Sequence, residues 1–162
     1  MPPVITFIGW HDSGKTTLVA QVVRLLKNRG YCLAVIKSTK ETGLLPDQDG
    51  TDTGAYKKAG ADAVTLAAPD RLIITAPCPE KDLPGLAERF FSDMDLVIGE
   101  GFKTADQVAK IEVFRGKGSR LADQVGGVIA AATDQEVSDS LIFSLNQPEK
   151  IADFLEKEYI LS

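Results

Sequence analysis

The chain alternates short apolar runs with segments whose apolar residues have helical spacing. The first run, residues 4–8, ends at Gly9, as expected for a buried strand of a parallel sheet. In the next segment the apolar residues occupy i, i+4, i+7 and i+8, which predicts an amphipathic helix ending near Gly30. These residues are Leu18, Val22, Leu25 and Leu26.

Further apolar runs continue this alternation to the end of the chain. Strands are predicted over 32–37, 63–67, 71–75, 95–99, 109–114, 125–132 and 141–143, and helices over 53–59, over 83–91 and after Asn146. The almost wholly apolar run 125–132 is predicted to lie near the centre of the sheet, and the polar stretch 38–54 is predicted to be a long loop. The pattern predicts an α/β fold with a mostly parallel sheet flanked by helices, and an antiparallel extension is expected beside it.

Two of the predicted helices carry start signals. Asp82 is expected to cap the helix over 83–91, with Pro84 in its first turn. Asn146 and Glu149 have the spacing of a capping box at the start of the last helix.

Length and charge limit the classes of function. A chain of 162 residues is predicted to form a single domain, 1–162. Its formal net charge of −5 gives no basic surface that would attract nucleic acid or an anionic membrane, and no apolar run is long enough to cross a bilayer. Cys32 and Cys78 are not spaced for a zinc knuckle or a disulfide framework, and the first residues do not resemble a signal peptide. We therefore expect a cytoplasmic protein.

The segment between the first predicted strand and helix fits the phosphate-binding motif G-x-x-x-x-G-K-[ST] of the P-loop NTPase fold. Its glycines let backbone N–H groups converge on phosphate oxygens, and the following helix adds the positive end of its dipole. Lys15 is expected to reach the β- and γ-phosphates, and the Thr16 hydroxyl to coordinate Mg²⁺. His11 is better explained as a solvent-facing loop residue than as a catalytic group. The predicted nucleotide-binding residues are Gly9, His11, Asp12, Ser13, Gly14, Lys15, Thr16 and Thr17.

A second element of such sites is a carboxylate at the end of a neighbouring strand, where it positions Mg²⁺ or its water. The apolar run 95–99 is flanked by Asp95 and Glu100. Ligands bind at the carboxyl ends of parallel strands, so Glu100 is favoured as the metal-binding and catalytic carboxylate. The alternative is that Glu100 only ends the strand in solvent.

Further short motifs follow in a fixed order along most of the chain. They are Gly14-Lys15-Thr16-Thr17-Leu18, Ile36-Lys37, Asp49 and Asp52 before Ala59-Gly60-Ala61, Glu100-Gly101-Phe102-Lys103, and Lys110-Ile111-Glu112-Val113-Phe114-Arg115. In this order they resemble molybdopterin-guanine dinucleotide biosynthesis protein B, a family of small GTP-binding proteins. The series is more specific than the phosphate-binding motif alone.

The resemblance implies GTP and Mg²⁺ as ligands and a role in attaching a guanine nucleotide to molybdopterin. It also implies weak GTP hydrolysis, a homodimer, a nucleotidyltransferase as partner, and molybdopterin or its guanine dinucleotide as a further ligand. The family often carries histidines after the Ile-Lys pair, whereas Ser38, Thr39 and Lys40 stand here. Any role of those histidines in binding the pterin or a metal is therefore not expected to transfer.

Three more residues have two interpretations each. Asp52 is a candidate catalytic and magnesium-binding residue of a switch loop, and a solvated carboxylate is as good an explanation. Lys37 can contact phosphate from the end of its strand, although a solvent-facing lysine is the commoner case. Asp134 follows an apolar strand and can accept hydrogen bonds from guanine, but no full N-K-x-D motif is present, and a turn-forming aspartate explains it equally well.

Three other functions remain open. A GTPase accessory protein for metal-centre assembly would use Cys and His ligands, and the two separated cysteines and His11 offer none. A small-molecule kinase using ATP would need an arginine-rich lid, which the sequence lacks. A binding module without turnover, in which GTP orders the loop over 38–54, is not excluded.

Overall fold

A computed structural model of the protein describes residues 1–42, 52–78, 82–138 and 141–162. Its residues cluster into two compact units, one of Met1–Thr39 with Asp82–Ser162 and one of Lys40–Lys81. The single domain predicted from chain length stays a prediction. In chain order the elements are β1 Val4–Ile8, α1 Lys15–Asn28, β2 Leu33–Lys37, α2 Asp52–Lys58, β3 Val64–Ala68, β4 Arg71–Thr75, α3 Leu83–Phe91, β5 Leu96–Glu100, β6 Ala109–Phe114, β7 Val128–Thr133, β8 Ile142–Phe143, α4 Pro148–Leu155 and the π-helix η1 Glu156–Ile160.

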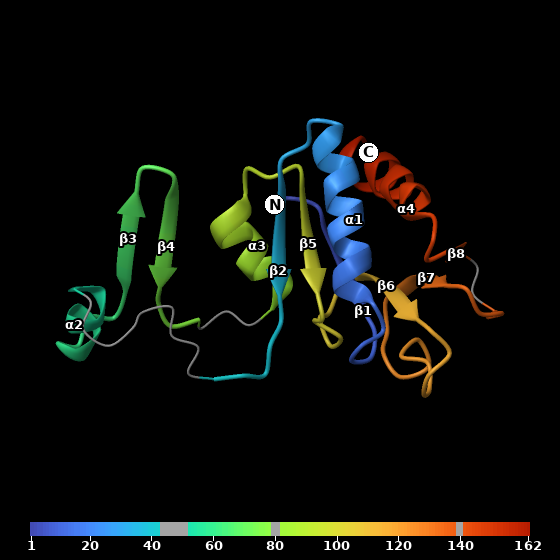
Figure 1. Ribbon diagram of the computed structural model, residues 1–162, viewed down its shortest axis with the longest axis horizontal. Helices are drawn as coiled ribbons and strands as arrows, with labels where there is room; N and C mark the ends of the chain where they lie inside the picture. Colours follow the sequence, from blue (N-terminus) through green and yellow to red (C-terminus); the bar gives the residue numbers. More distant parts are fainter. Residues whose placement is uncertain (43–51, 79–81, 139–140) are drawn as a thin grey trace. The chain divides into compact units, whose positions relative to one another are not determined.

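The first unit is built on one sheet of six parallel strands in the order β2-β5-β1-β6-β7-β8 (Figure 1). This confirms the predicted parallel sheet. The prediction that the run 125–132 lies near the centre was wrong, because β7 is next to the two-residue edge strand β8. Its apolar character is explained by burial of its side chains on the faces of the sheet, since residues 130–133 are buried.

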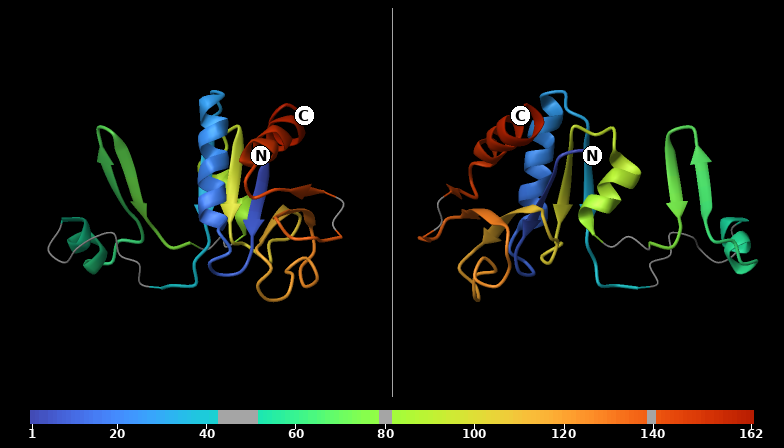
Figure 2. Two further views of the ribbon diagram at one scale, coloured as in Figure 1. Left: turned by 45° about the vertical axis from the view of Figure 1, so that its right-hand side comes forward. Right: turned by 180° about the vertical axis from the view of Figure 1, so that it is seen from behind.

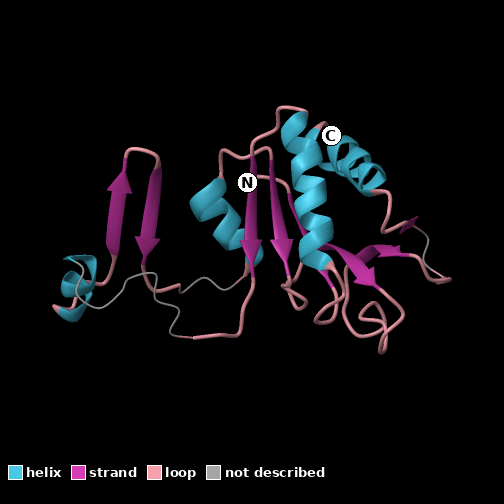
Figure 3. Cartoon of the chain, viewed as in Figure 1, coloured by secondary structure: helices cyan, strands magenta, loops and turns pink. Residues whose placement is uncertain are grey.

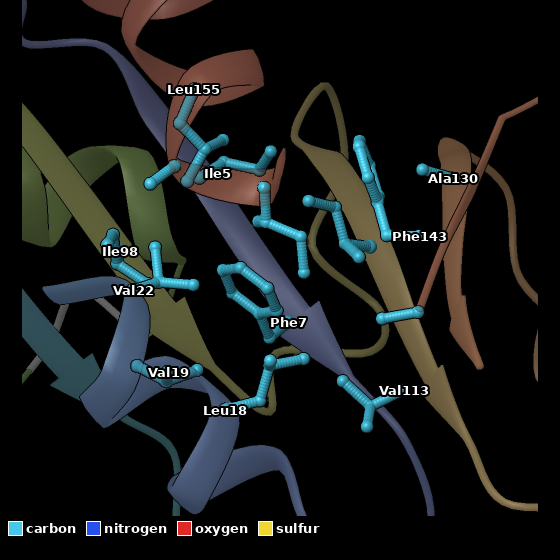
Figure 4. Close-up of a cluster of buried hydrophobic side chains, with 14 of the residues drawn as sticks. Ile5, Phe7, Leu18, Val19, Val22, Ile98, Val113, Ala130, Phe143 and Leu155 are labelled. Carbon is cyan, nitrogen blue, oxygen red and sulfur yellow. The ribbon is translucent and has the colours of Figure 1, made fainter. Parts of the chain in front are cut away.

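Helices cover both faces of this sheet. Helices α1 and α4 pack on one face, and α3 lies on the other, as the two views of Figure 2 show. Alternate residues of the strands face the two layers, as the pleat requires. Ile5, Phe7 and Ile98 join the α1–α4 side (Figure 4), whereas Val97 packs with Ala87 of α3.

The second unit contains an antiparallel hairpin, which accounts for the antiparallel extension expected from the sequence. Strands β3 and β4 form a sheet of their own, with Leu66 opposite Ile73 and Ala67 opposite Leu72. Four large aliphatic side chains of this hairpin are 37–60% exposed. They are Leu66, Leu72, Ile73 and Ile74.

The two helix starts differ from each other. Asp82 is the N-cap of α3, as predicted, and its side chain accepts a hydrogen bond of 3.0 Å from the Gly85 N–H. The predicted capping box of α4 was wrong. Gln147 occupies the N-cap position without a side-chain bond, because Pro148 has the backbone angle of a first helical residue and starts the helix one position later.

This difference makes a prediction about stability. Replacing Asp82 by alanine leaves the first turn of α3 without its side-chain acceptor, and is expected to lower the free energy of unfolding by about 1 kcal/mol. Gln147→Ala is the matched control and is expected to change it by less than about 0.5 kcal/mol. Urea unfolding of both variants measures this. Equal losses in the two would contradict the assigned caps.

The sheet brings three connections to one edge. The loops after β1, β5 and β6 all leave from carboxyl ends of adjacent parallel strands, next to the start of α1 (Figure 1). Ligands of open α/β sheets bind at this edge. The residues predicted to bind the nucleotide therefore lie at the edge of the sheet where ligands of this fold class bind.

Candidate nucleotide-binding site

The glycine-rich loop, residues 9–16, has a conformation that only glycine fits at two positions. A Cβ atom at Gly9 would lie 2.5 Å from Ser13 Oγ and 2.6 Å from the Val113 carbonyl oxygen. Gly14 has a φ of 87°, in the left-handed region that favours glycine. The turn is closed by the Ser13 N–H, which donates to the Trp10 carbonyl at 3.2 Å.

The start of α1 presents four unused hydrogen-bond donors. The backbone N–H groups of Gly14, Lys15, Thr16 and Thr17 have no acceptor among the described residues, and the first helical bond runs from the Leu18 N–H to the Gly14 carbonyl. The first turn holds no acidic residue, and the N-cap makes no side-chain bond. The positive end of the helix dipole is therefore left for an anion from outside the chain.

Lys15 is folded back over the loop. Its Nζ donates to the Trp10 carbonyl at 2.6 Å and to Ser13 Oγ at 3.3 Å. Burial lowers the pKa of the Lys15 ammonium; Glu100 raises it again, and the positive charges of Lys103 and Lys37 lower it further. An anion at this place would replace the lost hydration and relieve the repulsion among the ammonium groups.

Glu100 ends β5 beside the helix start. It is 7% exposed, so it is not a solvent-facing strand end. The Thr16 hydroxyl donates to its Oε1 at 2.7 Å, and the Lys37 ammonium lies 3.7 Å from the same oxygen. The structure thus brings together two of the three residues that the sequence proposed as magnesium ligands, Thr16 and Glu100, with Lys37 beside them.

Arg115 is a part of this site that sequence reasoning missed. From the end of β6, its Nε donates to the Ser13 carbonyl at 2.9 Å, and its guanidinium lies where a side chain on Gly14 would stand. Its position in the sequence could have indicated a role, because Arg115 directly follows a predicted strand and is the last residue of the ordered motifs. Arg115 braces the peptide between Ser13 and Gly14 from outside the loop.

The hydrogen bond from Arg115 to the glycine-rich loop predicts an effect of this residue on nucleotide binding. Arg115→Ala removes a charged hydrogen bond that holds the loop, and is expected to weaken nucleotide binding about tenfold, or about 1.4 kcal/mol, close to the lower end of the range for such a bond. Titration with a fluorescent GTP analogue measures the effect. Arg71→Ala removes an exposed arginine from the second unit and serves as the control. An equal loss in both variants would contradict a specific role for Arg115.

Known proteins resemble this chain over most of its length. The family model of molybdopterin guanine dinucleotide synthesis protein B (MobB) matches residues 4–134. The chain belongs to the MobB family. Molybdopterin-guanine dinucleotide biosynthesis adapter proteins of Escherichia coli K12 and Haemophilus influenzae are 35% and 32% identical, over 96% and 95% of this chain and 92% and 88% of theirs. A crystal structure of molybdopterin-guanine biosynthesis protein B matches with a TM-score of 0.75 and 29% identity, covering 95% of this chain and 98% of the other.

Membership of the MobB family agrees with the predicted fold class, a P-loop NTPase-like α/β fold. The matched residues include the glycine-rich loop, Glu100, Arg115 and Asp134. Within the described residues, no helix is both long and apolar enough to cross a bilayer.

The other candidate residues of this MobB-family chain lie in different settings. The side chains of His11 and Asp12 are 96% and 88% exposed, on the outer side of the loop. Asp134 Oδ1 accepts from the Ser144 hydroxyl at 2.9 Å and from the Leu145 N–H at 3.1 Å, so this carboxylate ties the end of β7 to the segment after β8. Asp52 begins α2 in the second unit, and its side chain lies outside the described residues.

Trp10 and Lys103 are further features that sequence reasoning did not assign. The Trp10 indole N–H donates to the Ser119 carbonyl at 2.6 Å, and the Lys103 ammonium lies 4.3 Å from the centre of the indole ring. The indole is thereby held between the β5–β6 and β6–β7 connections. Its place inside the glycine-rich motif was the only sequence signal.

Proposed function

We propose that this chain binds GTP with Mg²⁺ at the glycine-rich loop and assists the attachment of a guanine nucleotide to molybdopterin, together with a nucleotidyltransferase. The observation that carries the proposal is the start of α1, where four backbone donors have no acceptor among the described residues and Lys15 lies folded over the loop. A triphosphate satisfies these donors and this charge together, as in other phosphate loops at helix starts. The names of the related adapter proteins supply the biosynthetic role.

The residues at the helix start also fit Mg²⁺. This cation prefers oxygen ligands and is usually held by one or two protein groups plus phosphate oxygens and water. Thr16 Oγ1 and Glu100 Oε1 are 2.7 Å apart and are the kinds of ligand that such a site needs. When bound, the ion would neutralise charge on the β- and γ-phosphates.

Weak GTP hydrolysis is proposed for the same residues. Glu100 would orient the metal or its water, Lys15 would neutralise charge on the transferred phosphate, and Asp52 is proposed as a second carboxylate for this step. Arg115, by fixing the peptide after Ser13, would keep the backbone donors in place. The turnover is proposed to be slow, because an adapter needs the nucleotide-bound state to persist.

Guanine recognition is proposed for Asp134 at the end of β7. One of its carboxylate oxygens already accepts two hydrogen bonds, from Ser144 and Leu145. This fixes the side chain and leaves Oδ2 to accept from the N1–H and 2-amino groups of the base. A weaker preference for GTP over ITP in Asp134→Asn than in the wild type would support the assignment, and an unchanged preference would refute it.

A homodimer is proposed from the surface of the β3–β4 hairpin. A two-stranded sheet with a large exposed apolar area is marginally stable alone and marks an interaction surface. Leu66 and Ile73 are paired on one face of the hairpin, and Leu72 and Ile74 lie on the other, so both faces carry exposed apolar side chains. Sedimentation equilibrium is expected to give twice the chain mass, and a monomer at all concentrations would refute the dimer.

The role itself is tested by reconstitution. Purified nucleotidyltransferase, molybdopterin and limiting GTP are incubated with and without the chain, and the guanine dinucleotide product is quantified. We expect faster product formation with the wild type and none of this increase with Lys15→Ala. Stimulation by Lys15→Ala equal to that by the wild type would refute a GTP-dependent role.

A further inference from the structure

Strand β6 carries two buried charged side chains on one of its faces. Lys110 and Glu112 are 3% and 0% exposed and lie two positions apart, so the pleat directs both to the same side. Ile111 and Val113, which alternate with them, belong to the apolar core on the α1–α4 side of the sheet. Burying a charge is costly unless the charge is paired and hydrogen-bonded, so each of these two groups needs partners.

The two connections that flank β6 supply these partners. Residues 101–108 lead into the strand and residues 115–127 leave it, and neither of these stretches, both described throughout, contains a helix (Figure 3). Lys110 Nζ donates to the Ala105 carbonyl at 2.6 Å and to the Val108 carbonyl at 3.2 Å, both in the first connection. The other buried charge binds the second connection. Two connections without a helix of their own are thus held to β6 by buried charges.

Glu112 accepts three hydrogen bonds from consecutive residues of the second connection. Its Oε1 accepts from the Leu121 N–H at 2.6 Å, and its Oε2 accepts from Arg120 Nε at 2.7 Å and from the Ala122 N–H at 3.4 Å. The Arg120 guanidinium also lies 5.3 Å from the centre of the Phe114 ring. One carboxylate therefore fixes both the backbone and a side chain of this connection.

The part of the connection that is fixed in this way contacts the glycine-rich loop. The carbonyl between Ser119 and Arg120 accepts from the Trp10 indole N–H at 2.6 Å, so the peptide group that Trp10 binds is next to the one that Glu112 binds. Gln124 stiffens this segment, because its Nε2 donates to Ser119 Oγ at 2.9 Å and to the Arg120 carbonyl at 3.1 Å. The buried carboxylate and the indole are therefore linked through adjacent peptide groups.

Trp10 is also held from the side of the first connection. The Lys103 ammonium lies 4.3 Å from the centre of the indole ring, and Lys103 is two residues before Ala105, which Lys110 binds. An indole that contacts two fixed connections limits the conformations available to the glycine-rich loop, residues 9–16. A loop that is already in its binding conformation loses less conformational entropy when a phosphate binds.

We propose that Glu112 is a positioning residue of the nucleotide site, which acts on the glycine-rich loop through residues 119–122 and the Trp10 indole. In the part of the chain that the structure describes, its own hydrogen bonds all go to residues 120–122. The effect on nucleotide binding rests on the proposed function, whereas the effect on Trp10 does not.

A double-mutant cycle of Glu112→Gln and Trp10→Phe tests this role. Glu112→Gln keeps the shape of the side chain but removes its charge and one accepting oxygen, and Trp10→Phe keeps an aromatic ring but removes the N–H donor. Each is expected to weaken binding of a fluorescent GTP analogue about tenfold, and the double variant to bind no more weakly than either, because both break one path. Losses that multiply to about a hundredfold in the double variant, or unchanged affinity in Glu112→Gln, overturn the proposal.

Glu156→Gln is the matched control for a general loss of stability. Glu156 also pairs with an arginine, because it accepts from Arg29 Nη1 at 2.6 Å and from the Tyr31 hydroxyl at 2.8 Å, at the other end of α1. This variant is expected to lower the midpoint of urea unfolding and to leave GTP affinity unchanged. If Glu156→Gln loses as much GTP affinity as Glu112→Gln, affinity only follows stability and the proposal is overturned.

Acrylamide quenching of Trp10 in the unliganded chain is a test that needs no nucleotide. Trp10 is the single tryptophan, and its quenching constant is expected to be higher in Glu112→Gln than in the wild type and Glu156→Gln. Arg120→Met keeps the length of the side chain and both backbone donors to Glu112; it is expected to raise the constant as well, and it replaces Glu112→Gln in the cycle if that variant does not fold.

The two measurements distinguish this inference from the proposed function. Increased quenching in the variants without GTP binding by the wild type supports the role of Glu112 in holding Trp10 and refutes the proposed function. GTP binding by the wild type, with quenching unchanged in both Glu112→Gln and Arg120→Met, overturns this inference alone.

Discussion

Lys15→Ala is expected to weaken GTP binding at least a hundredfold, the largest effect of any single substitution in this chain. The ammonium already lies over the loop, 2.6 Å from the Trp10 carbonyl, and its pKa is lowered by burial. A triphosphate would pair with this charge where little water competes. A hundredfold change corresponds to about 2.7 kcal/mol, close to the upper range for one hydrogen bond to a charged group.

Lys27→Ala is the matched control for this prediction. Lys27 is in the last turn of the same helix, where its Nζ donates to the Tyr31 carbonyl. Its loss removes the same charge from α1 without touching the glycine-rich loop. Titration with a fluorescent GTP analogue compares the two variants, and unchanged affinity in Lys15→Ala would refute the site.

The second large effect is expected on magnesium. Glu100→Ala removes the acceptor of the Thr16 hydroxyl and one of the proposed metal ligands. We expect the increase in GTP affinity that Mg²⁺ produces in the wild type to fall about thirtyfold. Without Mg²⁺ the affinity should be unchanged or slightly higher, because a buried carboxylate no longer faces the phosphates.

Two observations keep this prediction specific. The magnesium dependence is obtained from titrations with GTP at a series of Mg²⁺ concentrations and in EDTA. Glu158→Ala removes an exposed carboxylate that pairs with Lys157, and should behave as the wild type. If Glu100→Ala shows the magnesium dependence of the wild type, the metal is held elsewhere.

The elements of the nucleotide site were predictable because their signals are local. The strand over 4–8, the motif after it and the spacing of the next helix all lie within one stretch of chain, and the observed β1 and α1 agree with them. Glu100 was also accessible, since the end of an apolar parallel strand places a side chain at the ligand-binding edge. The strand order explains its hydrogen bond with Thr16, because β5 lies next to β1 and the loop after β1 leads to the start of α1.

The residues that were missed act across long separations in sequence. Arg115 reaches Ser13 and Trp10 reaches Ser119, each about a hundred positions away. No local pattern distinguishes such residues from an ordinary loop arginine or a loop aromatic. They become visible only once the register of β1 and β6 is known.

The errors near the end of the chain have local physical causes. The capping box at Asn146 failed because Pro148 sets where α4 begins. The run 125–132 was placed too centrally, because apolar content reports that a strand is interior and not how many strands lie beyond it. In this chain only β8, a strand of two residues, lies beyond β7, and it is enough to make β7 an interior strand.

The central claim is that the glycine-rich loop binds a guanine nucleoside triphosphate, and Trp10 offers a direct measurement. Trp10 is the single tryptophan of the chain and lies inside the loop, with Lys103 over its ring. Its emission is followed while GTP or ATP is added in the presence of Mg²⁺, with equilibrium dialysis as a check on binding. We predict a saturable change with GTP and at least tenfold weaker binding of ATP. Equal or tighter binding of ATP, or no binding of GTP by either method, would contradict the account.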